Sequence, residues 1–504
     1  MKKYLVWIGA AVLVMAMASP SMAQFKSFGH LETFSYWMVN KSLDSRDTAA
    51  DKNYQGIGMR YRFNLGYGDP KTVMAVLGFE ANSRGLGETP EGGPAVIGAG
   101  SSPAGNSGSV SMAGRGNTGG WGTDQIGLQV RHAYFDFTIP NTPLTMQVGL
   151  QAQLIGGYLG RHFFLKDVPA FVLNGNFAPH TISAFWWKGV KQNYYIDNDL
   201  DYYGLRWRMK EKMVNVDAWF VYGNDRRSAI DSWTLARSGS GTVAAPYTYA
   251  LTETLTPRAY EVKPWWLGAN VPMTFGNLKI EPTLGYLGGK AQDAIAAGST
   301  LQTRDFSAYM GDIMATYRVG PGLSFLFEGY YASGTDGSKT GASDTVNAWQ
   351  TPTTAGDGSE NRNVFGNGWS VFYFTNTEFG YYHGHQLSPS GHWFLRGNAE
   401  YNPLAWLNLN FNYVYIQNAA NKNVAHISGA TTYTPPAGYA AGYSEKTNIG
   451  QEVNAIAKIA IYKDFQYRIG FGYFLPGDVF ETTGPTGKKA DDGWSLHTNL
   501  IYAF

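Results

Sequence analysis

The sequence of residues 494–504 is Trp494-Ser495-Leu496-His497-Thr498-Asn499-Leu500-Ile501-Tyr502-Ala503-Phe504. Side chains of a β-strand point alternately to opposite faces. The even-numbered positions here carry tryptophan, leucine, threonine, leucine, tyrosine and phenylalanine, and the opposite face carries serine, histidine and asparagine. This alternation predicts a strand with one apolar and one more polar face, and the sequence ends on an aromatic residue of the apolar face.

The same alternation occurs near the other end of the chain, with charged residues on the polar face. In residues 57–65, isoleucine, methionine, tyrosine, phenylalanine and leucine alternate with Gly58, Arg60, Arg62 and Asn64. An arginine at the midplane of a bilayer costs about 2–4 kcal/mol, so in a membrane barrel the arginine face must be the lumen. The same reasoning directs three further cations inward on a later strand, namely Arg206, Arg208 and Lys210.

The composition favours such a barrel over other classes. The 504 residues include no cysteine, and 39 Lys and Arg stand against 38 Asp and Glu, a net charge of +1. This balance gives no basic footprint for duplex nucleic acid, and the lack of cysteine excludes disulfides and thiolate zinc sites. Charged residues make up only 15% and aromatic residues also 15%. Few charges, many aromatics and a slightly negative mean hydropathy indicate a membrane β-barrel rather than a helical membrane protein.

The N-terminal segment has the pattern of an export signal. Lys2 and Lys3 precede an apolar run over 4–17, and small residues stand at Ser21 and Ala23. The run is shorter than the ~20 residues that a transmembrane helix needs, which favours a cleaved signal peptide over an anchor. We therefore predict a signal peptide at 1–23 and a single barrel domain at 24–504.

Short turns predict the number and direction of the strands. Segments of about ten alternating residues, the length a tilted strand needs to cross a membrane, are joined alternately by short turns and long polar loops. The short turns lie at 68–71, 139–143, 177–179, 211–213, 272–276, 319–322, 402–405 and 462–464. With a first strand at about 26–38 and a last at 494–504, they give an antiparallel up-and-down barrel of eighteen strands. Short turns belong on the periplasmic side and long loops outside. Sixteen strands is the alternative, if the hairpin near 170–190 does not form.

Two features resemble known outer-membrane proteins. The alternating strand that ends on phenylalanine, together with an export signal, resembles the C-terminal strand of Gram-negative outer-membrane proteins. The resemblance implies that Phe504, with Tyr502, is recognised by the barrel assembly machinery. Residues 130–137 (VRHAYFDF) and the following 146–151 (MQVGLQ) are similar to paired strands of several bacterial porin families. That resemblance implies a cell outer membrane location, contact with lipids and lipopolysaccharide, a homotrimer and no cofactor.

A barrel of this size predicts a channel. Sixteen to eighteen strands leave an aqueous lumen, so we expect passive diffusion of small hydrophilic solutes and ions. By alternation the lumen carries eleven cations, Arg60, Arg62, Arg131, Arg206, Arg208, Lys210, Lys279, Arg318, Arg396, Lys458 and Arg468. It also carries seven anions, Glu32, Glu80, Asp217, Glu281, Asp312, Glu328 and Glu400. The excess of cations predicts a mild preference for anions.

The resemblance to porins also implies a constriction. In porins the third external loop folds into the barrel and narrows it, and here the corresponding segment is 154–169. It contains Arg161, His162 and Lys166, which we expect to face solutes there. The alternative is an ordinary solvated outer loop.

Other functions find less support in the sequence. No local Ser, His or Asp motif indicates an outer-membrane enzyme, so we predict no catalytic activity. A substrate-specific channel and a barrel that sheathes a partner protein both stay open. His383, His385 and His392 lie close together in sequence, but no acidic or thiolate ligand accompanies them at a recognisable spacing. We therefore predict a polar loop rather than a metal site.

Overall fold

The computed structural model describes a barrel wall and parts of its connections. The described residues are 24–40, 53–69, 71–83, 120–121, 126–156, 163–190, 199–226, 232–238, 248–254, 261–294, 301–334, 345–347, 349–352, 369–374, 391–419, 422–423, 443–444, 447–480 and 491–504. The expected signal peptide lies outside them. No helix within these ranges is long and apolar enough to span a membrane.

Eighteen antiparallel strands form a closed barrel. In chain order they are β1 (Gln24–Val39), β2 (Asn53–Asp69), β3 (Val73–Ser83), β5 (Ile126–Thr138), β6 (Leu144–Ile155), β7 (Phe164–Phe177), β8 (His180–Val190), β9 (Leu200–Lys210), β10 (Asn215–Asp225), β13 (Glu261–Asn270), β15 (Leu278–Ala294), β16 (Leu301–Gly320), β17 (Leu323–Ala332), β19 (His392–Leu404), β20 (Leu407–Asn418), β23 (Asn448–Tyr462), β24 (Phe465–Pro476) and β25 (Gly493–Ala503). The expected eighteen strands are confirmed, and the alternative of sixteen is wrong.

Short additional elements accompany these strands. Three of them join the main sheet, β4 (Gly120–Trp121), β14 (Met273–Phe275) and β18 (Thr345–Val346). Two separate two-stranded sheets are formed by β11 (Ser232–Ser238) with β12 (Thr248–Thr254) and by β21 (Lys422–Asn423) with β22 (Tyr443–Ser444). One 3-10 helix, η5 (Asp478–Phe480), follows β24.

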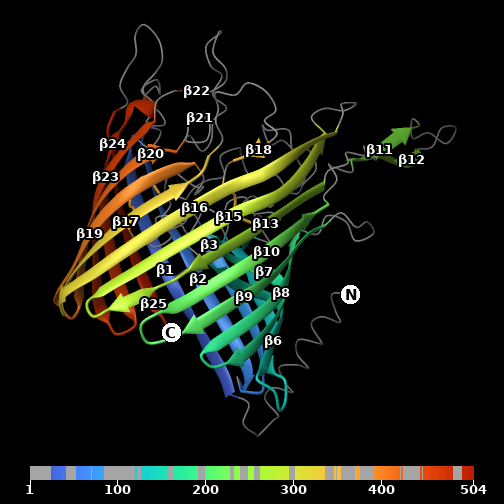
Figure 1. Cartoon of the computed structure of the whole chain (residues 1–504), viewed down its shortest axis with the longest axis horizontal. Helices are drawn as coiled ribbons and strands as arrows, with labels where there is room; N and C mark the ends of the chain where they lie inside the picture. The colour runs from blue at the N-terminus through green and yellow to red at the C-terminus, as the bar shows by residue number, and fades with distance from the viewer. Residues whose placement is uncertain are drawn as a thin grey trace.

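Each barrel strand pairs with the strand before and the strand after it, as the rainbow colouring of Figure 1 shows. The ring closes where β1 pairs with β25, from His30 opposite Ala503 to Val39 opposite Trp494. Backbone hydrogen bonds between Gly29 and Phe504 extend this seam, with N···O distances of 2.9 and 3.1 Å. All eight expected short turns join neighbouring barrel strands, including the turn of the β7–β8 hairpin, on which the choice between sixteen and eighteen strands depended.

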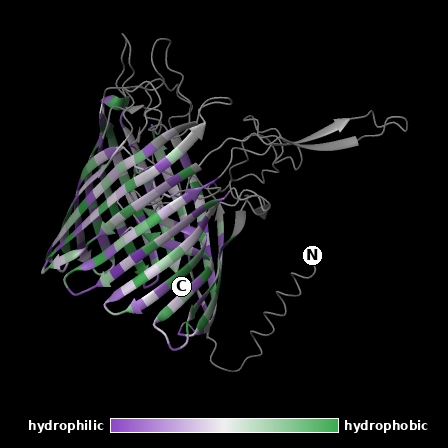
Figure 2. Cartoon of the chain, turned by 45° about the vertical axis from the view of Figure 1, so that its right-hand side comes forward, coloured by the Kyte–Doolittle hydropathy of each residue, from purple (hydrophilic) through white to green (hydrophobic). Residues whose placement is uncertain are grey.

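The two faces of the wall differ as the alternation predicts, and Figure 2 shows the resulting change of hydropathy from residue to residue along the strands. Large apolar side chains are exposed on the outer face, for example Leu284 (65%), Leu205 (57%) and Phe411 (53%). On β2, Ile57 and Phe63 are exposed outward while Arg60 is buried within the barrel. The outer face is therefore an apolar surface that suits lipid.

One strand starts earlier than expected. The sequence places a strand near 170–177, but β7 begins at Phe164 and pairs with β6 as far as Ile155. Both ends of the expected constriction segment 154–169 therefore belong to the wall, and 157–162 lie outside the described residues. Two adjacent charged residues, Lys166 and Asp167, interrupt the alternation in Phe164–Pro169. Lys166 is buried, and Asp167 pairs with Arg131.

The lipid-facing role of Leu284 predicts the cost of a charge there. We expect Leu284→Arg to lower the free energy of unfolding by about 2–4 kcal/mol, because arginine would enter hydrocarbon. Equilibrium urea unfolding in lipid vesicles measures this loss. Asn410→Arg, on the inner face of β20, is the matched control and should change stability much less. Equal losses for the two variants would contradict the assignment of faces.

Candidate functional site in the barrel lumen

A chain of alternating charges crosses the inner wall of the first strands. Arg60 of β2 pairs with Glu32 of β1 at 2.5 Å, and Arg62 pairs with Glu80 of β3 at 2.6 Å. Glu80 is also 3.4 Å from Arg131 of β5, and Arg131 lies 2.5 Å from a carboxylate oxygen of Asp167 on β7. Each cation is thus held by a carboxylate on another strand, so the charges stay fixed against the wall.

A β-bulge adds a histidine to this chain. The register of β3 with β5 shifts after Gly78, which pairs with His132, to Phe79, which pairs with Val130. Arg131 is the extra residue, so Arg131 and His132 both reach the interior. The imidazole of His132 lies 2.9 Å from the side-chain oxygen of Asn64 and 3.0 Å from Asp167. Strict alternation does not place His132 and Asp167 in the lumen, and no sequence pattern marks this bulge.

A second ion pair lies on the next part of the wall. Arg206 of β9 contacts both carboxylate oxygens of Asp217 on β10, each at 2.6 Å, and also donates to the backbone oxygen of Leu154 at 2.5 Å. Arginine therefore ties three strands together through one planar group. Arg208 and Lys210 follow toward the short-turn end, where they are exposed.

A further ion pair, between β19 and β17, is almost completely buried. Arg396 of β19 is 5% exposed and pairs with Glu328 of β17, which is 1% exposed. The guanidinium also donates to Asn412 at 3.2 Å and lies 4.7 Å from the ring centre of Trp369. The tryptophan comes from the connection between β17 and β19, so this connection reaches the interior of the barrel.

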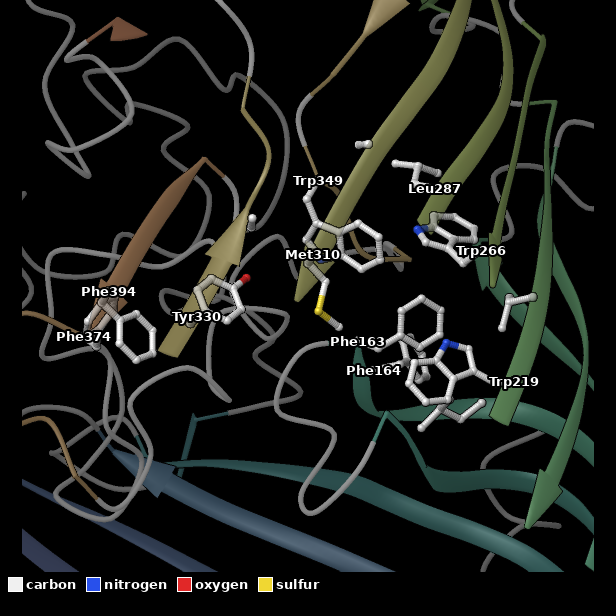
Figure 3. Packing of buried hydrophobic residues seen from close by; sticks show 14 of the residues in the cluster. Phe163, Phe164, Trp219, Trp266, Leu287, Met310, Tyr330, Trp349, Phe374 and Phe394 are labelled. Atoms are coloured by element: carbon white, nitrogen blue, oxygen red, sulfur yellow. The ribbon is translucent and has the colours of Figure 1, made fainter. Parts of the chain in front are cut away.

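Aromatic side chains fill another part of the interior, as Figure 3 shows. Phe163 lies between Trp219 and Trp266, with ring-centre distances of 5.6 and 6.0 Å. Trp187 stacks on Phe164 at 4.4 Å. These rings, with Trp349 and others, belong to one buried cluster that extends over strands on both sides of the barrel. Strand number alone predicts an open aqueous lumen, but this cluster occupies part of it.

Residues 369–374 lie against the opposite part of the wall. The rings of Phe372 and Tyr373 stack on Phe474 of β24 at 5.6 and 4.9 Å. Ser495 of β25 donates to the backbone oxygen of Val371 at 2.8 Å. A segment of the connection between β17 and β19 therefore folds into the lumen, which the sequence analysis did not predict.

Another wall residue that binds this segment is Glu452 of β23, which the sequence analysis missed. Its carboxylate accepts hydrogen bonds from Ser370 and from the backbone of the next three residues. A signal was present, because Glu452 shares its face of the strand with Lys458, which alternation had directed inward. No local sequence pattern predicts that residues 369–374 are the partner of Glu452.

The remaining expected site residues have different positions. Lys166 is 4% exposed on β7, and Arg468 of β24 donates to Gln466 at 2.5 Å. Arg161 and His162 lie outside the described residues, as do His383 and His385. His392 begins β19 and packs at 5.6 Å from each of the rings of Tyr330 and Phe374. Within the described ranges, no group of three or more His, Asp or Glu side chains could hold a metal ion.

Comparisons with known proteins find similar structures but no similar sequence. No family model matches the chain, and no curated protein matches it. OccAB4 of Acinetobacter baumannii is 11% identical, with 96% of this chain and 100% of that chain covered and a TM-score of 0.48. OccK2 of Pseudomonas aeruginosa is 9% identical, with 95% and 98% covered and a TM-score of 0.47. The trimer form of the outer-membrane protein OmpT of Vibrio cholerae is 9% identical, with 96% and 100% covered and a TM-score of 0.37.

The comparisons add a likeness to outer-membrane proteins, and the barrel architecture itself rests on the pairing of the chain's own strands.

The buried pair of Arg396 and Glu328 yields a test of the site. We expect Glu328→Gln to lower the free energy of unfolding by roughly 3–5 kcal/mol, because it removes the carboxylate that pairs with a buried arginine. Unfolding by urea in vesicles measures this loss. The double variant Glu328→Leu with Arg396→Leu removes both charges and should recover much of the stability. A double variant as unstable as the single one would argue against the pairing.

Proposed function

We propose that the protein is a porin, an outer-membrane channel for the passive diffusion of small hydrophilic solutes and ions. The observation that supports this most is the contrast between the two faces of one closed wall. Apolar side chains cover the outside, while paired charges from several strands line the inside. A barrel with this wall insulates a polar interior from lipid, which is what a solute channel requires.

The exposure of the inner side chains suggests that the passage is narrower at one end of the barrel. At the ends of the strands away from the short turns, inner-wall side chains such as Tyr36, Trp187 and Phe394 are 0% exposed. Nearer the short turns, the side chain of Lys279 is 46% exposed. The aromatic cluster and residues 369–374 account for much of this difference. Substrate selectivity through a restricted passage is therefore the second candidate function.

The charge arrangement supports a mild preference for anions. Many inner cations are neutralised by a carboxylate partner, including Arg60, Arg62, Arg131, Arg206 and Arg396. Arg208, Lys210 and Arg318 are exposed toward the short-turn end and can attract anions there. The pore-lining roles of these residues, and the constriction role of Lys166, Arg161 and His162, are part of this proposal.

The proposal includes the route and surroundings of the protein. Residues 1–23 would direct export to the outer membrane, where the barrel would contact lipid and lipopolysaccharide and form a homotrimer. Phe504, with Tyr502, would be recognised during assembly. In the folded barrel these two rings lie 6.1 Å apart, and Phe504 is also 6.1 Å from Phe63, so the terminal ring is also part of the apolar outer face.

Reconstitution of the purified protein tests the proposed function. Liposomes that contain it should swell in solutions of small sugars, at rates that fall with solute size and do not saturate for a diffusion channel. A saturable rate for one solute would favour the substrate-selective alternative. The absence of both swelling and single-channel current in planar bilayers would refute the porin assignment.

Two substitutions in the charge chain should change ion selectivity in opposite directions. Glu80 holds two arginines, so Glu80→Gln exposes their positive charge and should raise the ratio of anion to cation permeability, by roughly twofold. Arg131→Gln removes one of these cations and should lower the ratio. Reversal potentials in a salt gradient measure both effects. Shifts of the same sign in the two variants would contradict the role of this chain.

A further inference from the structure

Glu452 is a buried carboxylate with an unusual set of partners. It is 0% exposed, and its two oxygens accept five hydrogen bonds. The donors are the hydroxyl of Ser370 (2.8 Å), the backbone N–H groups of Val371 (2.7 Å), Phe372 (3.2 Å) and Tyr373 (3.0 Å), and the side-chain amide of Asn454 (2.8 Å). Four of the five come from the inward segment 369–374.

The carboxylate of Glu452 and the donors of the segment are chemically complementary. The five donors to Glu452 within the described residues are all neutral, so hydrogen bonds replace the counter-ion that a buried carboxylate usually has. Three successive backbone N–H groups that point to one place form a nest, an arrangement that binds anions. The wall supplies the anion that this nest requires.

Other contacts orient the segment on the same part of the wall. A Cβ atom added to Gly472 of β24 would lie 2.9 Å from the Cβ atom of Val371, so glycine allows the close approach of the segment. Ser370 also accepts a hydrogen bond from the backbone of Phe374 at 2.9 Å, which closes a compact turn around the carboxylate. Glu452 is the charged centre of this arrangement.

We propose that Glu452 is a latch that holds residues 369–374 against the wall and thereby keeps the width of the channel constant. This inference rests on the proposed channel function. The connection between β17 and β19 is long, and the latch fixes a point within it at the side of the lumen. Without the latch, the segment moves in the lumen and the conductance fluctuates.

The principal variant is Glu452→Gln, which keeps the size of the side chain. Its amide group is a donor where one carboxylate oxygen was an acceptor, so it faces an N–H or O–H donor of the segment. The loss of charge-assisted hydrogen bonds should increase the release of the segment roughly tenfold or more. Glu400→Gln is the matched control, because Glu400 lies on the inner face of β19 and accepts a bond from Asn408 at 2.7 Å.

Two measurements follow the release. Hydrogen exchange of the backbone amides of Val371, Phe372 and Tyr373 should be roughly tenfold faster in Glu452→Gln than in the parent and in Glu400→Gln. In planar bilayers, Glu452→Gln should show frequent steps to lower conductance, while the conductance of the parent and of the control should stay constant.

A reversible tether tests the cause of the fluctuation. The chain has no cysteine, so Val371→Cys with Gly472→Cys introduces a single pair. A Cβ atom at position 472 would lie 2.9 Å from that of residue 371, so the two backbones must separate by about 1 Å to reach the ~3.8 Å that a disulfide prefers. Combined with Glu452→Gln, the oxidised pair should give a quiet channel, and a reducing agent should restore the steps.

The outcomes separate the latch from the channel. If the parent forms no channel, the proposed function fails, and hydrogen exchange still decides whether the latch exists. If exchange in Glu452→Gln is as slow as in the parent, or if oxidation of the cysteine pair leaves the steps unchanged, the latch is refuted. Should Glu452→Gln not fold, Gly472→Leu displaces Val371 without a change of charge and must show the same exchange and the same steps.

Discussion

The closure of the sheet is the constraint on which the rest of the structure depends. In a bilayer no water is available to the backbone, so an open edge would leave a row of unpaired N–H and C=O groups in hydrocarbon. The pairing of β1 with β25 removes that edge. Once the ring is closed, each strand has one face toward lipid and one toward the interior, and the sequence must follow a period of two. The low charge content of the chain is a consequence of the outer face.

The interior faces a different constraint, because charges there need partners. In the wall, opposite charges on strands that are neighbours or nearly so form ion pairs, as with Arg206 and Asp217 on β9 and β10. Glu452 has a different kind of partner, because its charge accepts hydrogen bonds from neutral donors in a connection about eighty positions earlier in the chain. The ion pairs within the wall fix the positions of the charges, and the hydrogen bonds of Glu452 fix the position of residues 369–374 in the lumen.

The sequence predicted the wall much better than its contents. Alternation and turn residues are local signals, and they were sufficient for the eight short turns, the strand number and the inward position of Arg60. Two kinds of feature were missed. The bulge at Arg131 changes the phase of a strand without a distinctive residue, and so His132 was assigned no role. The inward position of residues 369–374 depends on contacts between distant residues, such as Val371 with Glu452 and Gly472, which no local pattern contains.

The seam between β1 and β25 has a consequence for how the barrel forms. It joins residues such as Phe34 and Asn499, which are separated by nearly the full length of the described chain. The other neighbouring strands follow one another in sequence, so their contacts are local and can form early. Long-range contacts carry the largest loop-closure cost and tend to form late. We expect the edge of β1 to stay unpaired until β25 has formed. Closure of the seam is then the slowest and most aggregation-prone step of assembly.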